Sequence, residues 1–126
     1  MWRGNHNRYR FNDLIQKFNG HKRLILGNHD QYHTSRYLEA GFEKVLAYQR
    51  LEGIIFSHIP IHPMSMGRAI GNVHGHIHQN PVFKPVCQVT PEKEVLWKPY
   101  VNVSVEAIDY TPVHLDELIS QCKKAG

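Results

Sequence analysis

The most regular pattern of apolar and polar positions lies near the N-terminus. Within residues 9–18, four apolar side chains stand at i, i+3, i+4 and i+7, namely Phe11, Leu14, Ile15 and Phe18. This spacing is typical of an amphipathic helix that buries one face. Gly20 follows and is suited to end the helix, because glycine readily adopts the left-handed conformation found just after helix ends. We therefore expect a helix over residues 9–18.

Short apolar runs after this helix predict strands. Leu24-Ile25-Leu26 has no polar interruption and stops at Gly27, which is typical of a strand buried on both faces in a parallel sheet. Residues 42–50 mix apolar and polar positions, and the run 54–56 is apolar again, so two adjacent strands joined around Glu52-Gly53 are expected. Between these strands, Thr34 or Ser35 is suited to cap a short helix that Gly41 ends.

The C-terminal half continues in the same manner. Residues 72–74 are too few to assign to a strand. The segment 80–99 is broken by four prolines, which predicts a long connection with one weak strand over 94–97. Residues 100–105 alternate as a half-buried strand, and residues 113–122 carry an apolar helical stripe with acids early and lysines at the end. Together these elements predict an α/β fold, with a mixed sheet and flanking helices.

Length and composition limit the class of protein. A chain of 126 residues is expected to be one domain, residues 1–126, and 41% hydrophobic with 21% charged residues is an ordinary globular mixture. Neither a signal peptide nor an apolar stretch of about 20 residues is seen, so we expect a cytoplasmic protein without a membrane partner. The net charge of +4 is scattered and no nucleic-acid-binding motif accompanies it, so nucleic acid enters only as a substrate.

The two cysteines do not suggest redox or zinc chemistry. Cys87 and Cys122 are far apart and neither belongs to a C-x-x-C pair, so both are interpreted as packing residues.

Histidine is the unusual component. The chain has ten histidines, and seven of them are grouped as His29/His33, His58/His62 and His74/His76/His78. Histidine is the commonest side-chain metal ligand and the usual acid or base near neutral pH, so this grouping favours chemistry. For any one histidine, the alternative is a solvated or core residue.

Three polar segments each follow a predicted strand: Gly27-Asn28-His29-Asp30, Ser57-His58 and Gly75-His76-Ile77-His78. The carboxyl ends of strands are where open α/β sheets hold ligands. Asparagine oxygen and imidazole nitrogen together suit manganese, iron or zinc better than calcium or magnesium. If the last segment is extended, His76 and His78 face the same side.

The ordered set GNHD, His and GHxH resembles the calcineurin-like metallophosphoesterase superfamily, with spacing similar to its small prokaryotic or phage-type members. The resemblance covers most of the chain. It implies an α/β sandwich with two metals per complete site, manganese being favoured over iron or zinc. It also implies hydrolysis of a phosphomonoester or phosphodiester, with a metal-bound hydroxide as the nucleophile.

Carried over position by position, the resemblance implies roles for six residues. Asn28, His58 and His76 would be ligands of the second metal and His78 a ligand of the first. His29 would contact phosphate and protonate the leaving group, with Asp30 orienting it. A histidine next to a ligand in the sequence is within reach of the departing alkoxide, which agrees with this assignment.

Several other residues are weaker candidates. Arg68 and His33 are candidates for contact with the substrate, although a solvated loop arginine is the usual alternative. His62 and His74 are interpreted as non-ligands.

The chain also departs from the family. The Asp-x-His and Gly-Asp blocks are absent, and the only acid before residue 27 is Asp13, inside the predicted helix. The family's first strands would then be missing, which leaves an exposed sheet edge. We weigh three readings: a C-terminal portion of a longer enzyme, a short form that rebuilds the site as a homo-oligomer through that edge, and a catalytically inactive binding or regulatory module with one metal per chain.

Overall fold

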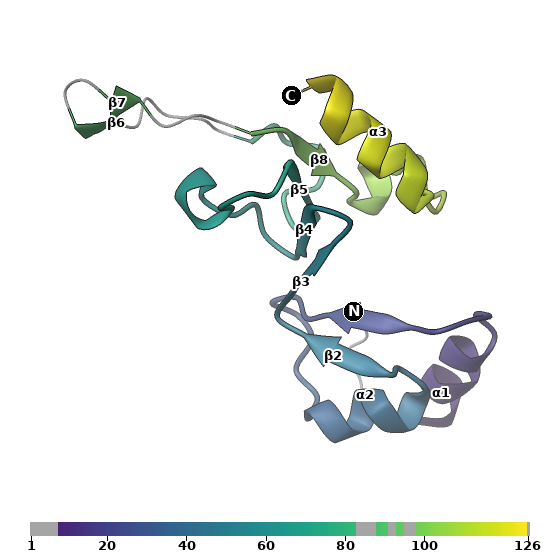
Figure 1. Cartoon of the computed structure of the whole chain (residues 1–126). Helices are drawn as coiled ribbons and strands as arrows, with labels where there is room; N and C mark the ends of the chain where they lie inside the picture. The colour runs from purple at the N-terminus through teal and green to yellow at the C-terminus, as the bar shows by residue number, and fades with distance from the viewer. Residues whose placement is uncertain (1–7, 83–87, 91–92, 95–97, 126) are drawn as a thin grey trace. The chain divides into compact units, whose positions relative to one another are not determined.

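The structure, a computed structural model, describes residues 8–82, 88–90, 93–94 and 98–125. The chain forms two compact units, Met1–Tyr48 and Gln49–Gly126 (Figure 1). The single domain expected from the length of the chain stays a prediction. Both contain helices and strands, which confirms the α/β class.

The first unit contains a parallel strand pair joined by a helix. Its elements are α1 (Arg8–Gln16), β1 (Arg23–Ile25), α2 (Thr34–Ala40) and β2 (Lys44–Leu46). β1 pairs in parallel with β2, with Leu24 opposite Val45, so β1-α2-β2 is a βαβ unit. The core of this unit consists of Phe11, Ile15, Leu24, Tyr37, Ala40 and Phe42.

The helix expected over residues 9–18 is confirmed as α1, but its apolar stripe is shorter than expected. Phe11 and Ile15 are buried, whereas Leu14 is 42% exposed, contrary to the prediction, and Phe18 is 58% exposed. The helix ends at Gln16, so Phe18 lies beyond the last helical turn and loses the helical register that would bury it. The assignment of Phe18 to the buried face was therefore wrong.

The C-terminal end of the short helix α2 agrees with the prediction, whereas its N-cap does not. Gly41 ends it with φ of 120°, as predicted. The N-cap, however, is His33 rather than Thr34 or Ser35: its Nδ1 accepts the backbone N–H of Ser35. A ring nitrogen of histidine here accepts the N–H that a Ser, Thr, Asp or Asn side-chain oxygen usually accepts at an N-cap.

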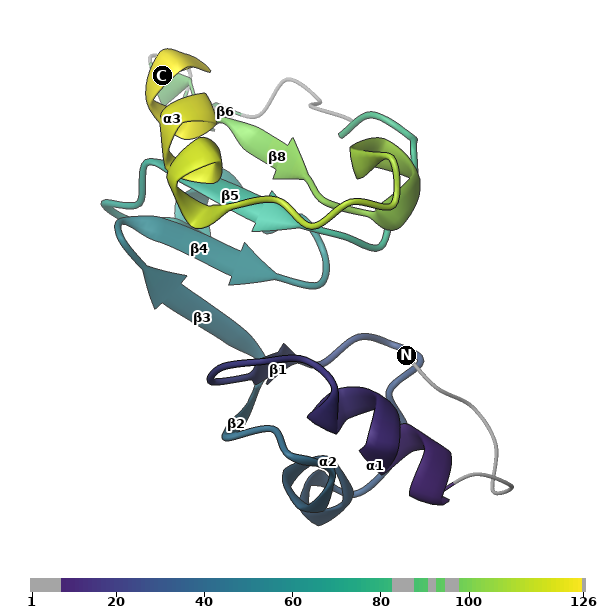
Figure 2. The ribbon, with the colours of Figure 1, turned by 90° about the vertical axis from the view of Figure 1, so that its right-hand side faces the viewer.

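The second unit is built on a four-stranded mixed sheet in the order β3-β4-β5-β8. The strands are β3 (Tyr48–Leu51), β4 (Ile54–Ser57), β5 (Gly71–His74) and β8 (Tyr100–Asn102). β4, β5 and β8 are parallel, and β3 runs the opposite way (Figure 2). The predicted turn at Glu52-Gly53 joins β3 to β4, and both residues have positive φ, 50° and 77°, as a two-residue hairpin turn requires.

The two faces of this sheet are covered differently. Helix α3 (Leu115–Ala125) packs on one face, where Ile54, Val73, Leu118 and Cys122 form the core. On β5, Gly71 allows the close approach of α3, since a Cβ there would lie 2.6 Å from Sγ of Cys122. A separate core packs Ile55 of β4 against Met66 and Ala69 in the segment that joins β4 to β5, which includes the 3-10 helix η2 (Pro63–Ser65).

Some boundaries differ from those predicted. Residues 42–50 form two strands, β2 and the start of β3, rather than one. The strand expected over 100–105 ends at Asn102, and Val105, 53% exposed, begins the 3-10 helix η3 (Val105–Ile108). The exposed side chain shows that the alternation stops before this position.

The long connection before β8 contains more strand than expected. β6 (Gln88–Thr90) and β7 (Lys93–Glu94) form an antiparallel pair. The weak strand predicted over 94–97 overlaps β7 at Glu94, and its residues 95–97 lie outside the described residues. Cys87 also lies outside the described residues. None of the helices in the described ranges is both long and apolar enough to cross a membrane.

Candidate functional site

The sheet of the second unit brings three chain segments to one edge. His58 follows β4 directly, and the segment Gly75–His78 follows β5. Ser57 and His74, the last residues of these strands, are partners in the parallel register, and Asn102 at the end of β8 is the partner of His74 on the other side. The three strands therefore end level with one another, at the carboxyl edge where such sheets bind ligands.

His58 and His76 are in contact at this edge. Nε2 of His58 lies 3.0 Å from Nδ1 of His76, and the rings meet at 69°. Two imidazole nitrogens bound to one metal at about 2.0–2.1 Å lie about 2.9 Å apart at a right angle and about 3.3 Å apart in tetrahedral geometry. The backbone N–H of Gly75 donates to the carbonyl of His58 at 2.9 Å and ties the two loops together. The pair thus fits two adjacent positions on one metal.

The segment that carries His76 and His78 is not extended, contrary to expectation. Both residues lie in the left-handed region, with φ of 66° and 53°. For a residue with a side chain this conformation costs about 1–2 kcal/mol, and such strain is found mainly where surrounding contacts enforce it. The turn sends the two side chains to different partners, His76 to His58 and His78 to Glu106.

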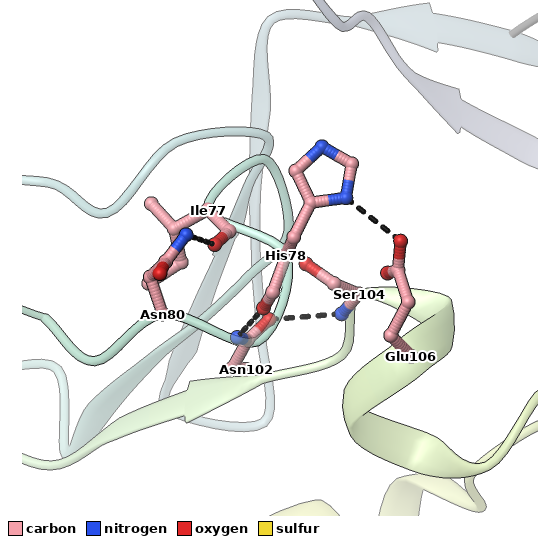
Figure 3. A network of polar contacts seen from close by, with 6 residues as sticks. All are labelled: Ile77, His78, Asn80, Asn102, Ser104 and Glu106. Carbon is pink, nitrogen blue, oxygen red and sulfur yellow. Dashed lines mark hydrogen bonds and ion pairs between the residues drawn. The ribbon is translucent and has the colours of Figure 1, made fainter.

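His78 is held at its side chain and at its backbone (Figure 3). Its Nδ1 lies 2.8 Å from Oε1 of Glu106, in the first turn of η3. The Asn102 amide nitrogen donates to the His78 carbonyl, while the amide oxygen of Asn102 accepts from the Ser104 N–H at 2.9 Å. The hydrogen bond to His78 is the main reason that the pKa of Glu106 lies below its ordinary value.

Neither Glu106 nor Asn102 was among the predicted site residues. They lie 28 and 24 residues beyond His78 in the chain, and no local motif connects them. The available signal was only that Asn102 lies within the strand predicted over residues 100–105.

A buried polar network supports the loop after His58. Ser57 Oγ donates to the Ile59 carbonyl at 2.6 Å, and Tyr100 Oη donates to the Ile61 carbonyl at 2.6 Å. Asn72, fully buried, accepts the Ile61 N–H at 3.0 Å through its amide oxygen. These hydrogen bonds fix the backbone that leads away from His58.

His74 lies in the core, as its interpretation as a non-ligand expects. The side chain is 1% exposed, and its Nδ1 donates to the Gly75 carbonyl at 3.0 Å. Nε2 is buried with no hydrogen-bond partner among the described residues. Burial lowers the pKa of His74, so the ring is held neutral. His62, the other predicted non-ligand, caps η2 by accepting the Met64 N–H.

The GNHD segment lies in the first unit, directly after β1. Asn28 and His29 are exposed in a turn. Asp30 closes this turn twice, because its carboxylate accepts the Gly27 N–H at 2.8 Å and its own N–H donates to the Gly27 carbonyl at 3.1 Å. Orientation of His29 by Asp30 stays a prediction.

The remaining candidates have the following places. His33 caps α2 in the first unit. Arg68 is exposed in the second unit, in the turn after η2. Asp13 is exposed on α1, as expected. Across the described part of the chain, no three His, Cys, Asp or Glu side chains converge closely enough to hold a metal ion.

Comparison with protein-family models, curated proteins and solved structures gives no match to this chain. The resemblance to metallophosphoesterases therefore rests on the motifs, and the site is assessed by its own geometry.

Proposed function

We propose that this chain is a metal-dependent hydrolase of phosphomonoesters or phosphodiesters, related to the calcineurin-like metallophosphoesterases and acting in the cytoplasm. The observation that carries the proposal is the contact between His58 and His76. Their ring nitrogens lie 3.0 Å apart at the carboxyl ends of two adjacent parallel strands. Two neutral imidazoles with no metal to share would gain only one weak hydrogen bond from this approach, whereas a transition metal would use both nitrogens.

The residues divide into two groups of ligands. His58 and His76, both in the second unit, would be ligands of one metal, and His78 would be a ligand of the other. Asn28, in the first unit, keeps the ligand role that the resemblance implies. Manganese, iron and zinc match these nitrogen and amide-oxygen donors. When bound, such metals supply Lewis-acid activation of the phosphate and a nucleophile at neutral pH.

His29 would donate the proton to the leaving oxygen. It is exposed in the turn that Asp30 closes on Gly27, so its backbone is fixed at the end of β1 while its ring is accessible to a substrate. Arg68 and His33 are the candidates for contact with the phosphate ester.

The proposal is tested by hydrolysis of a chromogenic phosphodiester and a chromogenic monoester. Metal-stripped protein is refilled with Mn²⁺, and wild type is compared with His76→Ala and with His62→Ala. His62 is the matched control, because it is an exposed histidine of the same unit that caps η2 and is not among the predicted metal ligands. Turnover that His76→Ala abolishes and His62→Ala keeps supports the proposal; absence of turnover in wild type overturns it.

A metal-binding protein without turnover is the second candidate. The small number of predicted ligands in contact within the second unit favours this candidate. His58 and His76 contact each other, whereas His78 contacts Glu106 instead. If this candidate is correct, titration of the metal-stripped protein with Mn²⁺ gives about one bound metal per chain, and the refilled protein hydrolyses neither phosphate ester.

A second copy of the chain is the proposed source of further ligands. β8 is the last strand in the order of the four-stranded sheet, and an edge strand presents backbone groups that another strand can pair with. Sedimentation with and without Mn²⁺ distinguishes a homo-oligomeric site from a monomeric one.

A further inference from the structure

The contacts around His78 point to two residues with a role that the motifs do not assign. We propose that Glu106 and Asn102 are positioning residues, which hold His78 so that its Nε2 is presented to a metal. This inference rests on the proposed function for the role of His78 as a ligand, but the positioning itself is a property of the metal-free chain.

The hydrogen bond to Glu106 selects one tautomer of His78. A carboxylate only accepts hydrogen bonds, so Nδ1 of His78, 2.8 Å from Oε1, must carry the proton. In the neutral ring, Nε2 then keeps its lone pair, which a metal can bind. Metal-binding histidines commonly donate their other ring N–H to a carboxylate or carbonyl in this way, which fixes the ring and raises its basicity.

Asn102 fixes the backbone of the same residue. Its amide nitrogen donates to the His78 carbonyl, and its amide oxygen is occupied by the Ser104 N–H. With both ends of the amide engaged, the carbonyl of His78 is tied to the end of β8. This contact helps to explain how a residue with a side chain stays in the left-handed region, with φ of 53°.

The two contacts come from one short stretch of chain. Asn102 ends β8, Ser104 is the N-cap of η3, and Glu106 lies in its first turn. Figure 3 shows the Asn102 amide directed at the backbone of His78 and the Glu106 carboxylate directed at its ring. The His78 side chain is 71% exposed, so core packing does not hold the ring, and these polar contacts are the described restraints on it.

The first experiment uses metal-free protein. The tautomer of His78 is read by ¹⁵N NMR of the histidine ring nitrogens in wild type, Glu106→Gln, Glu106→Ala and the charge control Asp116→Asn, an acid of the same unit that does not contact His78. We expect the Nδ1–H tautomer in wild type, Asp116→Asn and largely in Glu106→Gln, which keeps an acceptor oxygen. Glu106→Ala should show a mixture. A mixture already in wild type, or no change in Glu106→Ala, overturns the proposal.

The second experiment measures Mn²⁺ affinity by calorimetry in the same variants and in Asn102→Ala. Loss of a residue that orients a ligand typically costs about 10–100-fold in affinity. We expect that loss in Glu106→Ala and Asn102→Ala, a smaller one in Glu106→Gln, and none in Asp116→Asn. Equal affinity in all variants overturns the proposal. If wild type holds the tautomer but binds no Mn²⁺, the proposed function fails while the positioning of His78 is supported.

Discussion

Nε2 of His58 lies 3.0 Å from Nδ1 of His76, and the two rings meet nearly edge to face. The residues are 18 positions apart in the chain and are brought together because their strands, β4 and β5, are parallel neighbours that end level. The register of the two strands thus accounts for the contact between the rings.

The first prediction concerns how the two histidines act together. His58→Ala and His76→Ala should each weaken Mn²⁺ binding strongly, and the double variant should be little weaker than either single variant. Groups that share one partner show coupling energies of about 0.5–3 kcal/mol in such a cycle. Calorimetric titration of the four proteins measures the coupling, and strictly additive losses would contradict a shared metal.

The second prediction concerns the buried amide of Asn72. Asn72→Ala should destabilise the second unit by about 1–3 kcal/mol, because it leaves the part-buried N–H of Ile61 without its acceptor. Asn80→Ala is the matched control. It removes an exposed amide that donates only to Ile77 among the described contacts, and a surface change of this kind costs within about 0.5 kcal/mol. Urea unfolding gives both values, and equal stabilities would show that the loop is not held by Asn72.

The third prediction concerns the approach of α3 to β5. Gly71→Ala should destabilise the protein by about 1–3 kcal/mol, since the new methyl group would lie 2.6 Å from Sγ of Cys122. Cys122→Ala removes that sulfur, so the double variant should lose less stability than the sum of the two single variants. Thermal unfolding of the three variants provides the comparison; a double variant at or beyond the sum would place the strain elsewhere.

The fourth prediction concerns pH and His74. Burial lowers the pKa of this histidine below its ordinary value of 6.5, so at acid pH the unfolded chain binds a proton that the folded chain does not. The free energy of unfolding should therefore fall as the pH drops below about 6.5. His74→Gln should show a shallower fall between pH 7 and pH 5 in urea unfolding. An unchanged slope would mean that other histidines cause the acid sensitivity.

Much of the fold could be predicted because its signals are local. The apolar run at residues 24–26 forms β1 one residue earlier than expected, and the turn Glu52-Gly53 joins two strands as predicted. The position of His58 at the end of a strand also follows from an apolar run, residues 54–56, that stops before it. Apolar periodicity and turn residues act over a few positions, so a single sequence contains enough information to find them.

What the sequence could not predict depends on contacts between distant residues or on helix ends. Phe18 has the right spacing for the buried face of α1, but the helix stops before it. His76 and His78 have the spacing of an extended pair, but the left-handed turn that separates them is stabilised by Asn102, 24 residues beyond His78. His33 is an unusual cap, and propensities favour the hydroxyl residues that follow it.

The order of the strands along the chain has a consequence for how the protein folds during synthesis. β4 and β5 are complete by residue 74, and the turn with His76 follows at once, whereas β8 joins the sheet only after the long stretch of residues 75–99. Because a chain emerges N-terminus first, the contact of His58 with His76 can form before Asn102 and Glu106 have been made. In a nascent chain that has emerged as far as residue 99, His58 and His76 could therefore be in contact while the ring of His78 still rotates freely. Synthesis of β8 and η3 then supplies Asn102 and Glu106, whose hydrogen bonds fix His78.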